Sequence, residues 1–114
     1  MLLILGGAYQ GKLSWAQTRF CWRPEDLCDL AAGYVPGKKC YYHLEALTRL
    51  DPMPDAPDLM RADAVIAREI GSGVVPMDAG ERAWRERHGA LLRRLAGEAG
   101  GVVRIFCGLP EVLK

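Results

Sequence analysis

The 114-residue sequence predicts an α/β fold, in which a short, mostly parallel β-sheet lies between two layers of helices. Four short apolar runs have the composition of strands, and segments with helical character separate them. Three of these runs are rich in Val, Ile or Leu without strict alternation, which is typical of strands covered on both faces. The pattern favours βαβ units with right-handed crossovers within one domain over residues 1–114.

The expected strands are residues 2–5, 39–42, 64–70 and 102–107, so the sheet should have about four strands. A helix can follow the first strand over residues 14–20. Residues 51–58 contain three prolines and are expected to form a loop, because proline is not tolerated in a helix interior.

The clearest helix begins at Asp78, which forms an acidic capping box with Glu81. Gly100 and Gly101 should end this helix. Apolar residues and one histidine recur along it at steps of three and four and predict one buried stripe: Trp84, His88, Leu91, Leu92, Leu95 and Ala99. We therefore expect His88 to be a packed, hydrogen-bonded histidine rather than a catalytic base.

Composition and charge exclude several classes of protein. Half of the residues are hydrophobic and a quarter are charged, as in ordinary globular domains. The formal net charge of +1 gives no general attraction to nucleic acid or to an anionic membrane. No apolar run approaches the ~20 residues of a membrane span, and Met1 leads directly into a core strand, so a cytoplasmic location is expected.

The four cysteines, Cys21, Cys28, Cys40 and Cys107, contain no C-x-x-C pair. Cys107 is expected inside an apolar strand, and inert thiols in a reducing compartment are the preferred interpretation. The alternative is a zinc site that combines Cys21, Cys28 and Cys40 with His43, although the spacing is not that of a zinc finger.

A glycine-rich loop (residues 6–12) follows the first strand and matches the P-loop pattern G-x-x-x-x-G-K. In that motif, backbone N–H groups and the following helix N-terminus surround phosphate, and the lysine reaches the outer phosphates. The motif predicts a P-loop NTPase-like domain that binds phosphate. The expected nucleotide-binding residues here are Gly6, Gly7, Ala8, Tyr9, Gln10, Gly11, Lys12, Leu13 and Ser14. The alternative is a structural turn between a strand and a helix.

Leu13 occupies the position where the motif has Ser or Thr. That hydroxyl normally binds the Mg²⁺ that accompanies the nucleotide, so weakened Mg²⁺ binding and impaired phosphoryl transfer are expected. Ser14 could replace the hydroxyl, but a helix turns ~100° per residue, which should point Ser14 elsewhere.

A second glycine-rich turn, with Gly71 and Gly73, follows the strand expected at residues 64–70. Ligands of open α/β sheets collect at the carboxyl ends of strands, so Glu69 could lie beside the glycine-rich loop as a catalytic carboxylate. Turn glycines and a solvated glutamate are the alternative.

Several segments together resemble the adenosylcobinamide kinase / adenosylcobinamide-phosphate guanylyltransferase family of cobalamin biosynthesis. They are the glycine-rich loop, EIGSGVVP at residues 69–76, RAWRERHG at residues 82–89, Leu95-Ala96 and CGLPEVLK at residues 107–114. The resemblance covers residues 1–13 and about 62–114. It implies GTP or ATP as the nucleotide, a corrinoid (adenosylcobinamide) as partner, and a homo-oligomer. It also makes Lys12 and Glu69 catalytic candidates and Arg82 and Arg85 phosphate-binding candidates, with a solvated basic face as the alternative for the arginines.

The chain departs from that family in several places. Family members are longer and carry a histidine that takes the guanylyl group, in a segment with no counterpart here. His43 is the other histidine, but its neighbours Tyr42 and Leu44 suit packing better than nucleophilic attack. The sequence therefore predicts a shortened relative that binds purine nucleotide. The alternatives are a non-catalytic nucleotide- or corrinoid-sensing accessory protein and a structural, partner-binding remnant.

Overall fold

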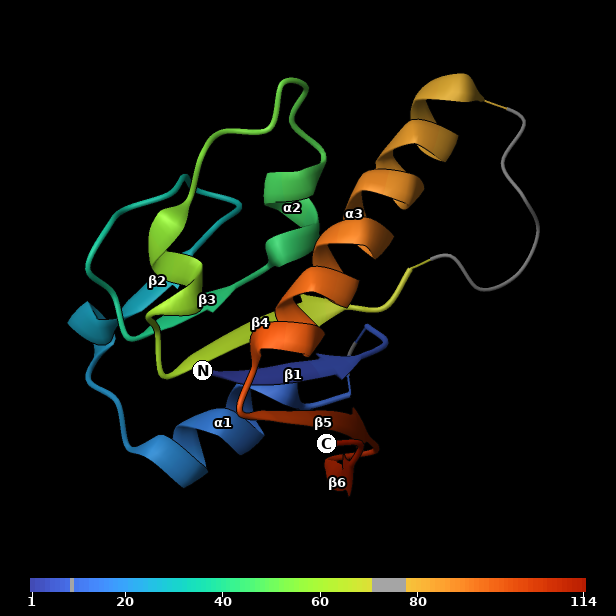
Figure 1. Ribbon diagram of the computed structural model, residues 1–114. Coiled ribbons are helices and arrows are strands. Elements are labelled where there is room, and N and C mark those ends of the chain that lie inside the picture. The colour runs from blue at the N-terminus through green and yellow to red at the C-terminus, as the bar shows by residue number, and fades with distance from the viewer. Residues whose placement is uncertain (9, 71–77) are drawn as a thin grey trace.

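The computed structural model describes residues 1–8, 10–70 and 78–114, which form one sheet with helices on both faces (Figure 1). The sheet has the order β2-β3-β4-β1-β5-β6. Its strands are β1 (Leu2–Gly6), β2 (Leu27–Asp29), β3 (Cys40–Tyr42), β4 (Ala64–Arg68), β5 (Gly101–Phe106) and β6 (Leu109–Val112). All neighbouring strands pair in parallel except β5 and β6, which are antiparallel. The predicted α/β fold with a mostly parallel sheet is confirmed.

Helix α1 (Lys12–Phe20) covers one face of the sheet, and α2 (Leu44–Thr48) and α3 (Ala79–Glu98) cover the other (Figure 1). Short 3₁₀ turns η1 (Pro24–Asp26) and η2 (Pro57–Met60) lie in the connections. Of the loop predicted at residues 51–58, residues 51–56 form a loop, and Pro57 and Asp58 begin η2. No helix in the described ranges is long and apolar enough to cross a membrane.

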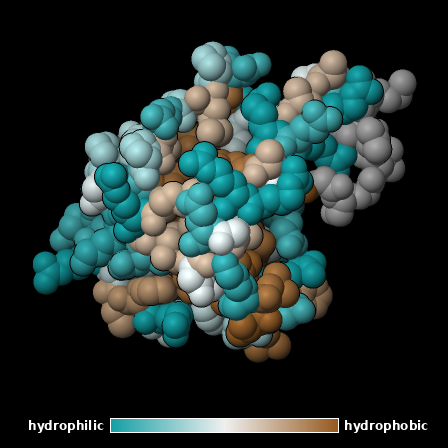
Figure 2. All heavy atoms as spheres, viewed as in Figure 1, coloured by the Kyte–Doolittle hydropathy of each residue, from teal (hydrophilic) through white to brown (hydrophobic). Residues whose placement is uncertain are grey.

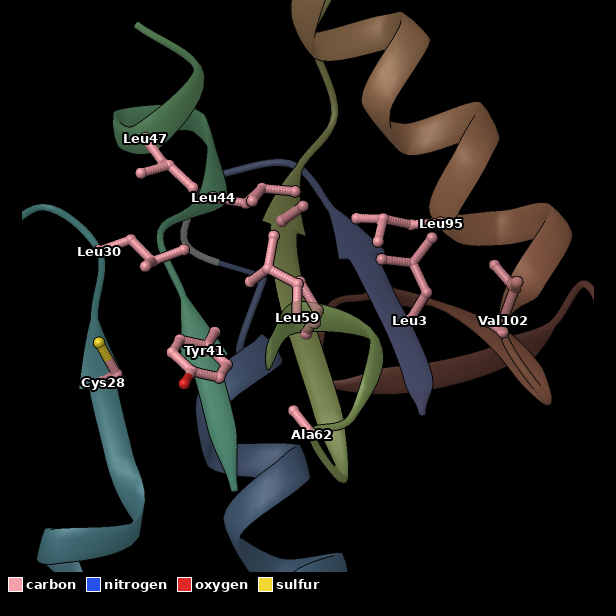
Figure 3. Close-up of a cluster of buried hydrophobic side chains, with 13 residues drawn as sticks. Leu3, Cys28, Leu30, Tyr41, Leu44, Leu47, Leu59, Ala62, Leu95 and Val102 are labelled. Atoms are coloured by element: carbon pink, nitrogen blue, oxygen red, sulfur yellow. The ribbon is translucent and has the colours of Figure 1, made fainter. Parts of the chain in front are cut away.

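Strands β1 to β5 supply side chains to two separate cores, because successive residues point to opposite faces. In β4, Val65 and Ala67 belong to the core under α2 and α3, which Figure 3 shows in detail. Ala64 and Ile66 belong to the core under α1. This double burial explains why the predicted strands lack strict alternation.

The sheet has six strands, whereas the sequence predicted about four. The two strands that were not predicted are β2 and β6. Strand β6 follows a two-residue turn in which Cys107 and Gly108 both have positive φ, 51° and 75°. Such turns match the twist of antiparallel strands. The expectation that Cys107 lies inside a strand is therefore wrong, and its thiol is exposed, as is that of Cys21.

Cys28 and Cys40 are buried, as expected of inert thiols, and burial raises the pKa of Cys40 to about 12. Among the described residues, no group of three or more metal-binding side chains is close enough to hold an ion. The structure therefore gives the zinc alternative no support.

Helix α3 begins after the predicted N-cap, Asp78, but the Glu81 carboxylate does not make the reciprocal contact of the predicted capping box. The Asp78 carboxylate accepts hydrogen bonds from the N–H groups of Gly80 (2.6 Å) and Glu81 (3.3 Å). The Glu81 carboxylate forms an ion pair with Arg49, which follows α2. Asp78 is therefore the N-cap of α3, and Glu81 connects the first turn of this helix to α2.

Candidate functional site

A cavity of about 390 Å³ opens at the edge of the sheet where the parallel strands end. We call it the edge cavity. Part of its lining comes from the glycine-rich loop and the start of α1, and part from the ends of β3 and β4 and from α2. The lining residues are Ala8, Gln10, Gly11, Lys12, Leu13, Ser14, Tyr42, His43, Glu45, Ile66 and Arg68. Ligands of parallel α/β sheets bind at this edge.

At two positions of the glycine-rich loop, the backbone leaves room or a favourable conformation only for glycine. A Cβ atom on Gly6 would lie 2.7 Å from the Ile105 carbonyl oxygen, so only glycine allows β1 to pass β5 this closely. Gly11 has φ +83° and is the N-cap of α1, a left-handed conformation that favours glycine. The loop therefore turns sharply out of β1 and directly into a helix.

The N-terminus of α1 gives the edge cavity positive character. The first helical hydrogen bond runs from the N–H of Trp15 to the carbonyl of Gly11 (3.0 Å), and the N–H groups before it have no acceptor within the helix. Lys12 Nζ donates to the Gly7 carbonyl at 2.6 Å. Burial lowers the pKa of Lys12, while the nearby carboxylates of Glu45 and Glu69 oppose this effect.

The turn between β5 and β6 is hydrogen-bonded to the glycine-rich loop. The N–H of Cys107 donates to Gln10 Oε1 (2.6 Å), and the N–H of Gly108 donates to the Gln10 carbonyl (2.9 Å). Sequence reasoning did not find this contact, because it joins residues nearly a hundred positions apart. Glycine at 108 was the one local signal, since a two-residue turn needs positive φ there.

The far side of the cavity comes from the ends of β3 and β4. Glu45 Oε1 accepts a hydrogen bond from the N–H of Arg68 at 2.9 Å, which fixes the carboxylate beside the end of β4. His43 directly follows β3, and its side chain is 51% exposed. The His43 ring packs beside that of Tyr42, as its neighbours suggested, but the side chain is exposed and lines the edge cavity with Lys12.

Leu13 and Ser14 both line the cavity. Leu13 also packs against the core under α1, which accounts for an apolar residue at the start of the helix. The expectation that the helix turns Ser14 away from the site is not met, since Ser14 is among the lining residues and is exposed.

Five predicted site residues within the described ranges are not among the lining residues of the cavity: Gly6, Gly7, Glu69, Arg82 and Arg85. Glu69 follows β4, and its N–H donates to the Gly6 carbonyl (3.0 Å), so it lies next to the loop. Its carboxylate forms an ion pair with Arg104 of β5 at 3.3 Å. Arg82 and Arg85 lie in the first two turns of α3 and are absent from the described lining. The predicted site residues Tyr9, Gly71 and Gly73 lie outside the described residues.

Comparison with known proteins identifies one family. The model of the cobinamide kinase / cobinamide phosphate guanyltransferase family matches residues 46–113, somewhat more than half of the chain. No curated protein matches the chain. The matched region contains β4, α3, β5 and β6, but the glycine-rich loop and His43 lie before it. Any role of the loop therefore rests on its spacing and geometry.

Proposed function

Because this chain belongs to the cobinamide kinase / cobinamide phosphate guanyltransferase family, we propose that it binds the triphosphate of GTP or ATP in the edge cavity. The observation that carries the proposal is the convergence of Lys12 with the α1 N-terminus in a cavity at the carboxyl edge of the sheet. Both the free helical N–H groups and the ammonium favour an anion there. Residues 6–8 and 10–14 would surround the phosphates.

We propose that phosphoryl transfer by this chain is impaired, because Leu13 supplies no oxygen ligand for Mg²⁺. Ser14 and Glu45 are the oxygen-bearing residues of the cavity that could hold the ion through water. Glu69 lies beside the loop and is the second acidic candidate, although its carboxylate already pairs with Arg104. We propose cobinamide, or another corrinoid, as the acceptor, on the family relationship alone.

Guanylyl transfer through a histidine is not part of the proposed function. Both ring nitrogens of His88 are engaged in the interior, with Thr48 and with the Arg68 carbonyl. Arg82 and Arg85 are proposed as phosphate or partner contacts. This role would require a substrate that extends from the edge cavity toward the first turns of α3.

A non-catalytic nucleotide or corrinoid sensor is the second candidate, and Leu13 is the observation that favours it. Titration calorimetry with GTP, ATP and cobinamide, followed by an assay for transfer of the γ-phosphate, separates the candidates. Binding with turnover supports the kinase, and binding without turnover supports the sensor. Absence of binding to GTP, ATP and cobinamide contradicts both candidates and leaves a structural, partner-binding role.

We also propose that the chain forms a homo-oligomer in the cytoplasm and binds no nucleic acid. Four large apolar side chains near the C-terminus are exposed: Phe106, Leu109, Val112 and Leu113. They belong to the β5–β6 hairpin and the residue that follows it, and Figure 2 shows hydrophobic surface in the lower part of the molecule, where Figure 1 places this hairpin. Strand β6 is also an edge strand. Analytical ultracentrifugation of the unaltered chain and of Val112→Lys tests the role of this surface, since a charge there should lower the association constant.

A further inference from the structure

Asp29 and His43 form a hydrogen-bonded pair beside the edge cavity. Asp29 is the last residue of β2, and His43 follows Tyr42, the residue paired with Asp29 in the β2–β3 ladder. The parallel register therefore brings both side chains to the carboxyl edge, where His43 Nδ1 lies 2.7 Å from Asp29 Oδ1. The pair depends on sheet pairing between residues 14 positions apart.

The backbone of His43 is held in an uncommon conformation. Its φ and ψ are 61° and 45°, in the left-handed region that non-glycine residues seldom occupy. His43 is also the N-cap of α2 but makes no side-chain cap hydrogen bond. The strained position between β3 and α2 thus directs the ring toward Asp29 and the cavity rather than toward the helix.

The hydrogen bond to Asp29 determines which nitrogen of His43 remains available. An ionised carboxylate only accepts hydrogen bonds, so Nδ1 carries the proton and donates to Asp29. In the neutral ring, Nε2 then has a lone pair, and among the described residues Asp29 is the ring's one hydrogen-bond partner. This is the tautomer that an aspartate imposes on a histidine base.

Five charged or titratable side chains either contact His43 or line the cavity with it, and each comes from a different element. They are Asp29 of β2, Tyr42 of β3, Lys12 of α1, Glu45 of α2 and Arg68 of β4. The Tyr42 ring lies with its centroid 4.8 Å from that of His43, tilted by 59°, and packs beside the imidazole. Lys12, the proposed phosphate ligand, and His43 line the same cavity.

We propose that His43 is the catalytic base of phosphoryl transfer and that Asp29 is its positioning residue. This inference rests on the proposed function. The hydroxyl oxygen of an alcohol acceptor forms a bond to the γ-phosphorus, and its proton passes to His43 Nε2. The bond between the γ-phosphorus and the β,γ-bridging oxygen breaks, and the nucleoside diphosphate leaves with that electron pair. Asp29 holds the tautomer and stabilises the imidazolium that forms.

The test measures nucleotide affinity and turnover separately. Calorimetry gives the Kd for ATP, and transfer of labelled γ-phosphate to cobinamide in the presence of Mg²⁺ gives kcat and kcat/KM. His43→Gln should lower kcat by about a hundredfold or more with the Kd for ATP unchanged, and added imidazole should restore turnover to His43→Ala. Asp55→Asn, an exposed carboxylate change in the loop of residues 51–56, is the matched control for Asp29→Asn and should leave kcat unchanged.

Two readouts distinguish a base from a structural role: rescue of His43→Ala by imidazole, and a loss of kcat in His43→Gln with an unchanged Kd for ATP. Asp29→Asn, which removes the carboxylate that holds the tautomer, should also lower kcat without changing the Kd for ATP. Failure to bind ATP contradicts the proposed function itself. Binding without transfer, or transfer unaffected by His43→Gln, overturns the base assignment and leaves nucleotide binding intact. An acid-labile nucleotide label on His43 would instead make it a nucleophile and also overturn the assignment.

Discussion

Thr48 Oγ1 lies 2.9 Å from His88 Nδ1 in the buried contact between α2 and α3. His88 Nε2 lies 2.7 Å from the Arg68 carbonyl at the end of β4, so Nε2 must donate. Burial lowers the pKa of His88 and favours the neutral ring, in which Nδ1 accepts a hydrogen bond from the Thr48 hydroxyl. The Trp84 indole also donates to Thr48 Oγ1, at 3.0 Å. A neutral histidine therefore joins both helices to the strand that ends at the edge cavity, as the predicted buried role of His88 requires.

Protonation of His88 should destabilise the fold. Burial lowers the pKa of His88 below its ordinary value of 6.5, so below pH 6.5 the unfolded chain binds more protons than the folded chain. The free energy of unfolding should therefore fall as the pH decreases through 6.5. Urea denaturation between about pH 7.5 and 5.5 measures this. In His88→Gln the fall should be smaller, and an equal fall would assign the pH dependence to other groups.

Gly6 should not tolerate a methyl group. Gly6→Ala would place Cβ 2.7 Å from the Ile105 carbonyl, and the backbone of β5 would have to move. We expect a loss of about 1–3 kcal/mol in the free energy of unfolding. Gly97→Ala is the matched control, because it adds the same methyl group in open space on α3. It should stabilise the chain by about 0.5–1 kcal/mol, and a comparable loss in both variants would refute the steric explanation.

Leu13→Ser should restore an oxygen ligand for Mg²⁺. The variant should bind ATP with a stronger dependence on Mg²⁺ and transfer phosphate faster than the unaltered chain, because the metal aligns and neutralises the phosphates. Leu13→Ala is the control, since it removes the same apolar bulk without adding a hydroxyl. Calorimetry with and without Mg²⁺ makes the comparison. Identical Mg²⁺ dependence in the serine and alanine variants would contradict a metal role for this position.

The chain should acquire no covalent guanylyl group. The family's transfer histidine has no counterpart, His88 is buried with both nitrogens hydrogen-bonded, and His43 is proposed as a base. Incubation with α-labelled GTP and Mg²⁺, followed by neutral and acidic denaturation, checks for a phosphoramidate. A stoichiometric, acid-labile label that is lost in His43→Ala would restore the full two-step enzyme as the function.

The sequence predicted those parts of the fold whose signals are local. Residues 2–5 and 64–67 are continuous apolar runs, although β4 ends at Arg68 rather than at residue 70, and Asp78 marked the start of α3 to within one residue. Strand β2 has three residues, and every residue of β6 is exposed, so neither carries a hydrophobic run. These strands exist because β3 and β5 provide partners, and such pairing is not visible in a short segment.

The candidate site also contains residues that local sequence predicted and residues that it could not predict. The glycine-rich loop and Lys12 are contiguous and were predicted from spacing, and they line one side of the edge cavity. Two other features arise only when strands distant in sequence are brought into register. They are the Asp29–His43 pair and the hydrogen bonds from the N–H groups of Cys107 and Gly108 to Gln10. Arg82 and Arg85 were placed by family resemblance, and their predicted contact with phosphate stays a prediction.

Calorimetric titration of GTP and ATP into Lys12→Ala tests the central claim most directly. Lys12 contributes a charge-assisted contact to phosphate, so its loss should cost roughly 1.5–3 kcal/mol, a weakening of about ten- to more than a hundredfold. Lys39→Ala removes an exposed lysine that does not line the edge cavity and should leave the affinity unchanged. Equal affinity in the folded Lys12→Ala protein and the unaltered chain would contradict phosphate binding by the glycine-rich loop.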